Sequence, residues 1–147
     1  MRERLSSAWQ LVREMAGERD YENYLAQQIH EEYRRQDVAR VTTQMYLSDM
    51  EPAMIPSDAW AKMAHRETER VAIDDLEGRI TGILLTPYPP GIPLLIPGER
   101  FNRTIVSYLQ FARAFNARFP GFDTDVHGLV TELVDGRYDY FVDCVKL

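Results

Sequence analysis

This chain of 147 residues has one cysteine, two lysines and no long apolar run, and each scarcity excludes a class of protein. The lone Cys144 excludes an internal disulfide, and no apolar stretch reaches the roughly 18 residues of a membrane span. The first residues also lack the apolar core of a signal peptide. These observations together predict a cytoplasmic protein without a membrane partner.

The charge balance is acidic, with 23 Asp and Glu against 17 Lys and Arg and a formal net charge of −6. Nucleic acid is therefore not an expected partner, because phosphate binding needs a basic surface. Hydrophobic residues make up 45% of the chain and charged residues 27%, as in ordinary globular proteins. This length is enough for one domain with a single core.

Residues 86–100 form the most distinctive segment, with five prolines and two glycines set among isoleucine and leucine. Each proline fixes its own φ angle, removes a backbone donor and disfavours helix for the residue before it. We therefore predict a rigid, extended loop, with Tyr88, Ile92, Leu94 and Ile96 buried or at an interface. Its Pro-x-x-Pro spacings also suit a ligand of an SH3-type module, but the flanking apolar residues oppose such exposure.

Apolar spacing predicts long helices over 3–16, over about 20–35 and from Asn102 or Thr104 to about Phe119. The first has an apolar stripe that consists of Leu5, Ala8, Trp9, Leu11, Val12 and Met15. A shorter helix is expected after an N-cap at Ser57, ending near Arg66. Residues 38–48 are β-branched and polar, which leaves helix and strand both open.

Asp135-Gly136 is the strongest local signal, because this dipeptide is typical of a two-residue hairpin turn. The predicted strands 126–134 and 137–145 then set Leu133 opposite Tyr138, Thr131 opposite Tyr140 and Leu129 opposite Val142 on a largely apolar face. The other face sets Glu132 opposite Asp139, an unfavourable pair expected to face water.

Further short strands are predicted at 69–73 and 80–86, with a turn at 74–78. The fold class is therefore α+β: a small domain with N-terminal helices, short strands, a proline-rich loop and a C-terminal β-hairpin. One compact unit is expected, with 1–50 as a helical lead-in segment and 51–147 as the α+β domain.

Three motifs occur in order along the second part of the chain. Asp75-Leu76-Glu77-Gly78-Arg79-Ile80 precedes the proline-rich segment, and Pro120–Gly128 and Asp135–Tyr138 follow it. Over about residues 56–145 this series closely resembles the C-terminal domain of bacterial ornithine/lysine/arginine decarboxylases, which are pyridoxal-phosphate enzymes. The resemblance implies a lyase that removes the α-carboxyl group of a basic amino acid and releases a polyamine-type product, a diamine or agmatine.

The family's chemistry needs a lysine for the Schiff base with the cofactor. Lys62 and Lys146 are the only lysines, and neither stands in the Ser-x-His-Lys context typical of the family. We therefore expect no cofactor in this chain and no activity by the chain alone, which would be an excised fragment or the product of an incomplete gene. Pyridoxal phosphate is expected in the full-length enzyme, on a large cofactor domain that the chain lacks.

In family members this domain packs on the cofactor domain, lines the route to the active site and contributes to assembly. The implied partners are that domain and further subunits of a homo-oligomer. The alternative function is a free-standing, non-catalytic binding or oligomerisation module. Both functions agree with the missing cofactor lysine.

No residue is predicted to be catalytic, cofactor-binding or metal-ligating. The candidates for the substrate route or an interface are Tyr88, Glu99, Asp123, Asp125 and His127. The acidic C-terminal residues form either a solvated face or a rim that attracts cationic amino acids. Asp123 and Asp125 are expected to orient His127 or to favour its charged form, with a neutral, backbone-bonded histidine as the alternative.

Two other chemistries find little support. The hairpin register sets His127 roughly opposite Cys144, but metal sites need three or four ligands, so a structural pair is favoured over a metal site. No nucleophile elbow supports a Ser/His/Asp triad.

Overall fold

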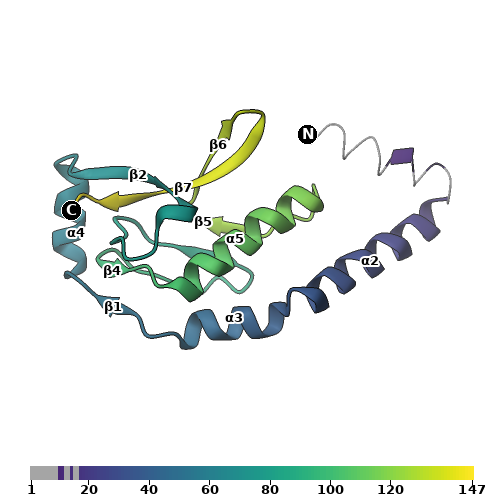
Figure 1. The fold of residues 1–147 in the computed structure, drawn as a ribbon, viewed down its shortest axis with the longest axis horizontal. Helices are drawn as coiled ribbons and strands as arrows, with labels where there is room; N and C mark the ends of the chain where they lie inside the picture. Colours follow the sequence, from purple (N-terminus) through teal and green to yellow (C-terminus); the bar gives the residue numbers. More distant parts are fainter. Residues whose placement is uncertain (1–9, 12–13, 15–16) are drawn as a thin grey trace.

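The computed structural model describes residues 10, 11, 14 and 17–147, which Figure 1 shows as a small α+β unit with a helical arm. The arm consists of α2 (Glu18–Arg35) and α3 (Val38–Leu47), and it passes along one side of α5 (Arg103–Arg118). After Gly17, the remaining helical elements are the short helix α4 (Pro56–Ala64) and the 3-10 turn η1 (Ile73–Asp75). The helix predicted over 3–16 lies outside the described residues, except for residues 10, 11 and 14.

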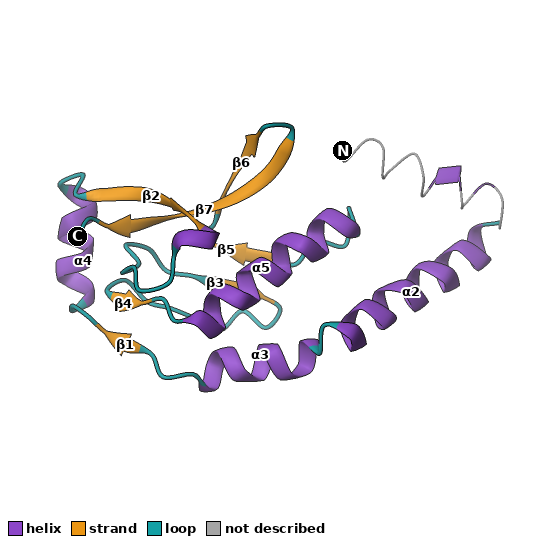
Figure 2. Cartoon of the chain, viewed as in Figure 1, coloured by secondary structure: helices purple, strands orange, loops and turns teal. Residues whose placement is uncertain are grey.

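Three small antiparallel sheets hold the strands, which Figure 2 shows in orange. The largest has β7 (Arg137–Val145) between β2 (Thr68–Ala72) and β6 (Val130–Val134). The second pairs β1 (Glu51–Pro52) with β4 (Glu99–Arg100). The third pairs β3 (Thr86–Tyr88) with β5 (Asp125–His127) and brings the proline-rich loop beside the Pro120–Gly128 motif.

The predicted hairpin turn is confirmed, because Asp135 and Gly136 have φ angles of 49° and 77° and Leu133 pairs with Tyr138. The predicted apolar face is largely exposed near the tip, where Leu133 and Tyr138 face solvent. On the other face Glu132 and Asp139 do pair, and each carboxylate binds an arginine: Arg70 in β2 and Arg113 in α5. These ion pairs offset the repulsion between the opposed carboxylates.

The predicted strand 126–134 is wrong, because the chain turns at Gly128 and divides it into β5 and β6. Gly128 has a φ angle of 101°, and a Cβ there would lie 2.3 Å from the carbonyl oxygen of Leu84, so only glycine fits. The β6–β7 pairing consequently ends at Val130 and Phe141 and does not reach Leu129 and Val142. The predicted His127–Cys144 pair is also wrong, since His127 pairs with Thr86 and Cys144 with Glu69.

Of the two predicted helix N-caps, one prediction is confirmed and the other is wrong. The Asn102 cap is confirmed, since its side-chain oxygen accepts a hydrogen bond from the backbone nitrogen of Ile105 at 2.9 Å. The Ser57 cap is wrong, because α4 is capped by Ile55 with Pro56 at its first position, where the missing N–H costs nothing. That helix ends at Ala64, two residues earlier than predicted.

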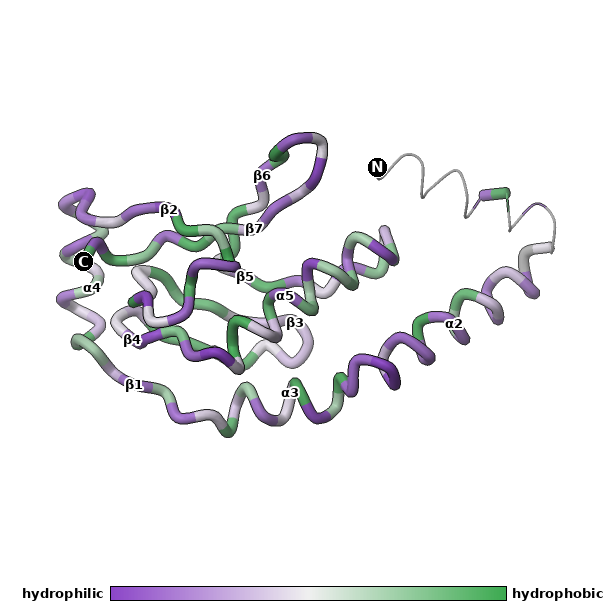
Figure 3. The backbone as a smooth tube through the Cα atoms, viewed as in Figure 1, coloured by the Kyte–Doolittle hydropathy of each residue, from purple (hydrophilic) through white to green (hydrophobic). Residues whose placement is uncertain are grey.

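The main core lies between α5, the three-stranded sheet and the proline-rich loop. Ile105, Tyr108 and Leu109 of α5 are buried there with Leu85, Leu94 and Leu95, and Met45 of α3 joins them. In Figure 3, green hydrophobic residues recur along α5, whereas α2 is mostly hydrophilic. The predicted strand over 80–86 is wrong, because only isolated bridges form at Ile80, Thr81 and Leu85.

Candidate functional site

The proline-rich loop is fixed at both its ends and its middle. Leu94 donates its backbone N–H to the carbonyl of Leu85 at 2.7 Å, and Gly91 donates to Pro87 at 2.8 Å. The hydroxyl of Tyr46 in α3 donates to the carbonyl of Ile92 at 3.0 Å. These hydrogen bonds therefore hold the loop in one conformation, although most of its backbone belongs to no helix or strand.

Some apolar side chains of this loop are buried and others are exposed. Leu94 and Leu95 are fully buried, as predicted for Leu94. Tyr88, Ile92 and Ile96 are 49%, 55% and 41% exposed, so they are not buried within this chain, and their place at an interface stays a prediction. The loop thus anchors itself with two leucines and presents an apolar outer side.

Three of the five candidate residues come together beside this loop, and we call them the Tyr88–His127 cluster (Tyr88, Asp125 and His127). Tyr88 and Asp125 are directly opposite in the β3–β5 pair. The Nε2 atom of His127 lies 2.9 Å from Oδ2 of Asp125, and the Tyr88 and His127 rings are 4.7 Å apart between centroids. Asp125 is thus the carboxylate that orients His127, while both side chains remain mostly exposed.

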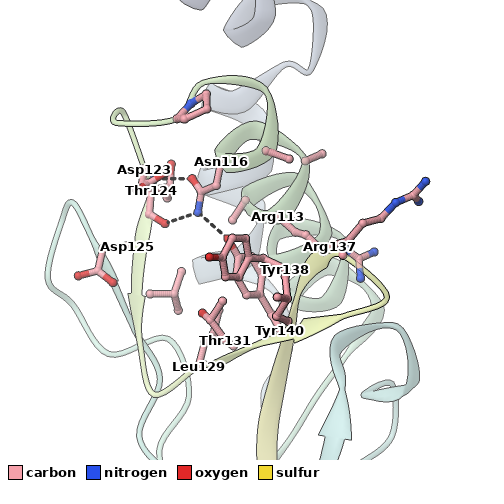
Figure 4. Close-up of a pocket in the computed structure, with 17 residues that line it drawn as sticks. Arg113, Asn116, Asp123, Thr124, Asp125, Leu129, Thr131, Arg137, Tyr138 and Tyr140 are labelled. Carbon is pink, nitrogen blue, oxygen red and sulfur yellow. Dashed lines mark hydrogen bonds between the residues drawn. The ribbon is translucent and has the colours of Figure 1, made fainter. Parts of the chain in front are cut away.

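A groove adjoins the cluster, between the second half of α5 and the β6–β7 hairpin (Figure 4). We call it the α5–hairpin groove; its volume is about 1190 Å³, and Asp123 and Asp125 are among its lining residues. Asn116 of α5 fixes the chain before β5, because its side chain accepts from the Thr124 nitrogen at 2.7 Å and donates to the Thr124 carbonyl at 3.0 Å. Sequence reasoning missed Asn116, because an amide on a polar helix face carries no spacing signal.

Glu99 lies apart from the other candidates. Its carboxylate accepts a hydrogen bond from the backbone nitrogen of Ile96 at 2.8 Å and so closes the far end of the loop. Its contact is structural.

Arg113 is a second residue that sequence reasoning missed. Its guanidinium binds Asp74 of η1 at 2.7 Å and Asp139 of β7 at 2.9 Å, which ties three elements together. The hydrogen bond from Arg113 lowers the pKa of Asp74 below its ordinary value. No motif marks this arginine, because its two partners are 39 and 26 residues away along the chain.

The described side chains do not fit pyridoxal phosphate. Lys62 pairs with Glu67 at the surface, and the ammonium of Lys146 lies 3.4 Å from the carbonyl of Arg66, so neither lysine lies in the groove. Over the described part of the chain, no three His, Cys, Asp or Glu side chains lie close enough together to bind a metal ion. Among the helices that the structure describes, none combines the length and apolarity of a membrane span.

Comparison with known proteins places this geometry in context. Residues 39–146 match the model of the Orn/Lys/Arg decarboxylase, C-terminal domain, family. The lysine decarboxylase LdcA of Pseudomonas aeruginosa is 47% identical over 125 residues, which cover 83% of this chain and 17% of that protein. The constitutive lysine decarboxylase of Escherichia coli K12 is 36% identical over 117 residues, covering 78% of this chain and 16% of that protein.

The solved structure of lysine decarboxylase A from Pseudomonas aeruginosa has a similar fold. It superposes with a TM-score of 0.74 at 48% identity, covering 80% of this chain and 16% of that one. The chain thus spans about a sixth of the length of the relatives it matches. The chain belongs to the family of Orn/Lys/Arg decarboxylase C-terminal domains.

Proposed function

We propose that this chain is the accessory domain of a pyridoxal-phosphate-dependent decarboxylase of basic amino acids and packs on its cofactor domain. The observation that carries the proposal is the apolar outer side of the proline-rich loop, formed by Tyr88, Ile92 and Ile96. Exposed apolar surface of this kind marks interaction sites. A loop that is already rigid also loses little entropy when a partner covers it.

The cofactor would belong to the other domain, where it supplies the electron sink for decarboxylation. In this chain, the Tyr88–His127 cluster would border the route of the substrate. Asp125 supplies an exposed carboxylate beside the loop. Lysine, arginine and ornithine are cations, so negative charge along their route raises their local concentration.

In the complete enzyme, this domain would also contact other subunits and so contribute to a homo-oligomer. The support is a second exposed apolar surface on α4, where Trp60 is 70% exposed and Ile55 is also exposed. The cytoplasm is the proposed compartment, supported by a sequence whose lone cysteine cannot form an internal disulfide.

Mixing two separately produced proteins tests whether this chain packs on a cofactor domain. The cofactor-domain part of Pseudomonas aeruginosa LdcA, without its last domain, is mixed with this chain and followed by analytical ultracentrifugation. We expect a complex that Ile92→Asp abolishes and Leu147→Asp, a more exposed apolar position outside the loop, leaves intact. Association that ignores the loop variant contradicts this packing surface. No association between the two folded proteins supports the free-standing module.

A further inference from the structure

Asn116 lies inside a helix, although its side chain disfavours that conformation. It stands two residues before α5 ends at Arg118. Asparagine is less favourable than alanine within a helix, because its amide competes for backbone hydrogen bonds. A residue that breaks a local preference in this way points to a role outside its own helix.

The Asn116 amide pairs with the backbone of Thr124 as a residue of a neighbouring β-strand would. Its Oδ1 accepts a hydrogen bond from the Thr124 nitrogen at 2.7 Å, and its Nδ2 donates to the Thr124 carbonyl oxygen at 3.0 Å. Two residues of an antiparallel pair exchange the same two kinds of bond. Asn116 therefore holds the backbone immediately before β5 begins at Asp125.

A third contact fixes the orientation of this amide. Its Nδ2 also lies 3.1 Å from the hydroxyl oxygen of Tyr140 in β7 (Figure 4). A flipped amide would set Nδ2 against the N–H of Thr124, so the three contacts together permit only one orientation. Asn116 thus links the start of β5 to α5 and to the three-stranded sheet.

The position of the Asp125 carboxylate depends on this link. The side chain of Asp125 is 66% exposed, and its Oδ2 lies 2.9 Å from Nε2 of His127. Because so exposed a side chain has few neighbours to hold it, its backbone determines where the carboxylate lies. Tyr88 pairs with Asp125 across β3 and β5, so a shift at Thr124 would disturb the whole Tyr88–His127 cluster.

Two arginines line the same groove, and neither neutralises Asp125. Arg113 already binds two other carboxylates, those of Asp74 and Asp139. Figure 4 shows Arg137 on the other side of the groove from Asp125. The negative charge of Asp125 therefore depends on its own placement and not on the arginines.

We propose that Asn116 is a positioning residue for the Tyr88–His127 cluster, because its amide fixes the backbone from which Asp125 reaches His127. The consequence for substrate capture rests on the proposed function, in which Asp125 attracts a cationic amino acid. The contacts themselves lie within this chain and need no enzyme. The positioning and its consequence can therefore be tested separately.

NMR of the full chain tests the positioning. The rings of Tyr88 and His127, with centroids 4.7 Å apart, are close enough for a nuclear Overhauser cross-peak. We expect Asn116→Ala to lose this cross-peak while α5 stays folded, because alanine favours helix. Gln110→Ala is the matched control, since this amide of α5 donates to Asp74 at 2.8 Å instead of binding the chain before β5. A cross-peak that survives Asn116→Ala, or that both variants lose, overturns the proposal.

Kinetics of the decarboxylase that contains this domain test the consequence. Asn116→Ala should raise the KM for lysine by about twofold to tenfold at low salt, as expected for Asp125→Asn, with kcat unchanged. The double variant should match Asp125→Asn alone, because both changes remove the same carboxylate from its place. Increases in KM that multiply in the double variant contradict the positioning. A lost cross-peak with KM unchanged in all three variants supports the positioning and contradicts the proposed substrate route.

Discussion

The ring of Tyr88 lies against the imidazole of His127, with centroids 4.7 Å apart and the planes tilted by 37°. The contact joins the proline-rich loop to the Pro120–Gly128 motif, and the carboxylate of Asp125 also contacts the imidazole. Residues about forty positions apart thus form one exposed group beside the loop. This relationship gives the proposed substrate route its specific residues.

Removing the charge of Asp125 should weaken substrate capture. In the decarboxylase that contains this domain, we expect Asp125→Asn to raise the KM for lysine by about twofold to tenfold at low salt with kcat unchanged. Asp58→Asn, on the exposed start of α4, serves as the control. Equal kcat/KM values for both variants over a salt series would remove Asp125 from the route.

Leu94 should carry much of the stability that the loop contributes. Its side chain is 1% exposed in the main core, so Leu94→Ala should lower the free energy of unfolding by about 2–5 kcal/mol. The neighbouring Ile92→Ala should change it by less than about 0.5 kcal/mol, because Ile92 faces outward. Urea denaturation measures both, and equal effects would contradict the division of burial along the loop.

Glu32 should make stability depend on acid pH. Burial raises the pKa of this carboxyl, but hydrogen bonds from Arg35 and Gln36 and the charge of Arg118 outweigh burial, so the pKa lies below its ordinary value of 4.5. A lowered folded pKa contributes stability above the unfolded value, and that stability disappears as the pH falls through the folded value. Glu32 also links α2 to α5 through Arg118.

We therefore expect Glu32→Gln to cost about 1–3 kcal/mol at pH 7 and progressively less below pH 4.5. Thermal unfolding over a pH series measures this, with the exposed neighbour Glu31→Gln as the control. A cost that stays constant into acid would show that the ion pair does not link the helices.

Cys144 should be inert in the folded chain. Burial raises the pKa of its thiol to about 12, and the nearby Asp143 and Glu69 act in the same direction against Arg79. Because the thiolate is the reactive form, a thiol-specific reagent at pH 8 should modify Cys144 only after unfolding. Ser57→Cys, at an exposed position, should react at once. Rapid modification of Cys144 in the native chain would contradict its burial.

Local sequence signals predicted the elements that depend on them. The Asp135-Gly136 turn and the Asn102 cap are set by a few adjacent residues, and both are confirmed. The sequence of residues 38–48 did not decide between helix and strand, because packing against other elements stabilises this helix. Met45 is buried in the core that α5 forms. Tertiary packing thus overrides the weak helix preference of its β-branched residues.

The residues of the candidate site were predicted only in part, because their contacts also depend on the tertiary structure. Tyr88, Asp125 and His127 were named from the motifs, but their contact depends on the β3–β5 pairing. That pairing follows from the turn at Gly128, whose need for a positive φ angle the surrounding sequence does not reveal. Asn116 and Arg113 act across long sequence separations, and periodicity reports only which face of a helix is apolar.

The most direct measurement is lysine decarboxylation by a chimera of Pseudomonas aeruginosa LdcA in which this chain replaces the matching last domain. We predict that LdcA without that domain is inactive and that the chimera recovers activity. Ile92→Asp in the chimera should remove it again, whereas Leu147→Asp should not. A chimera as inactive as the truncated enzyme, although folded and bound to pyridoxal phosphate, would contradict the assignment of this chain as an accessory domain of a decarboxylase.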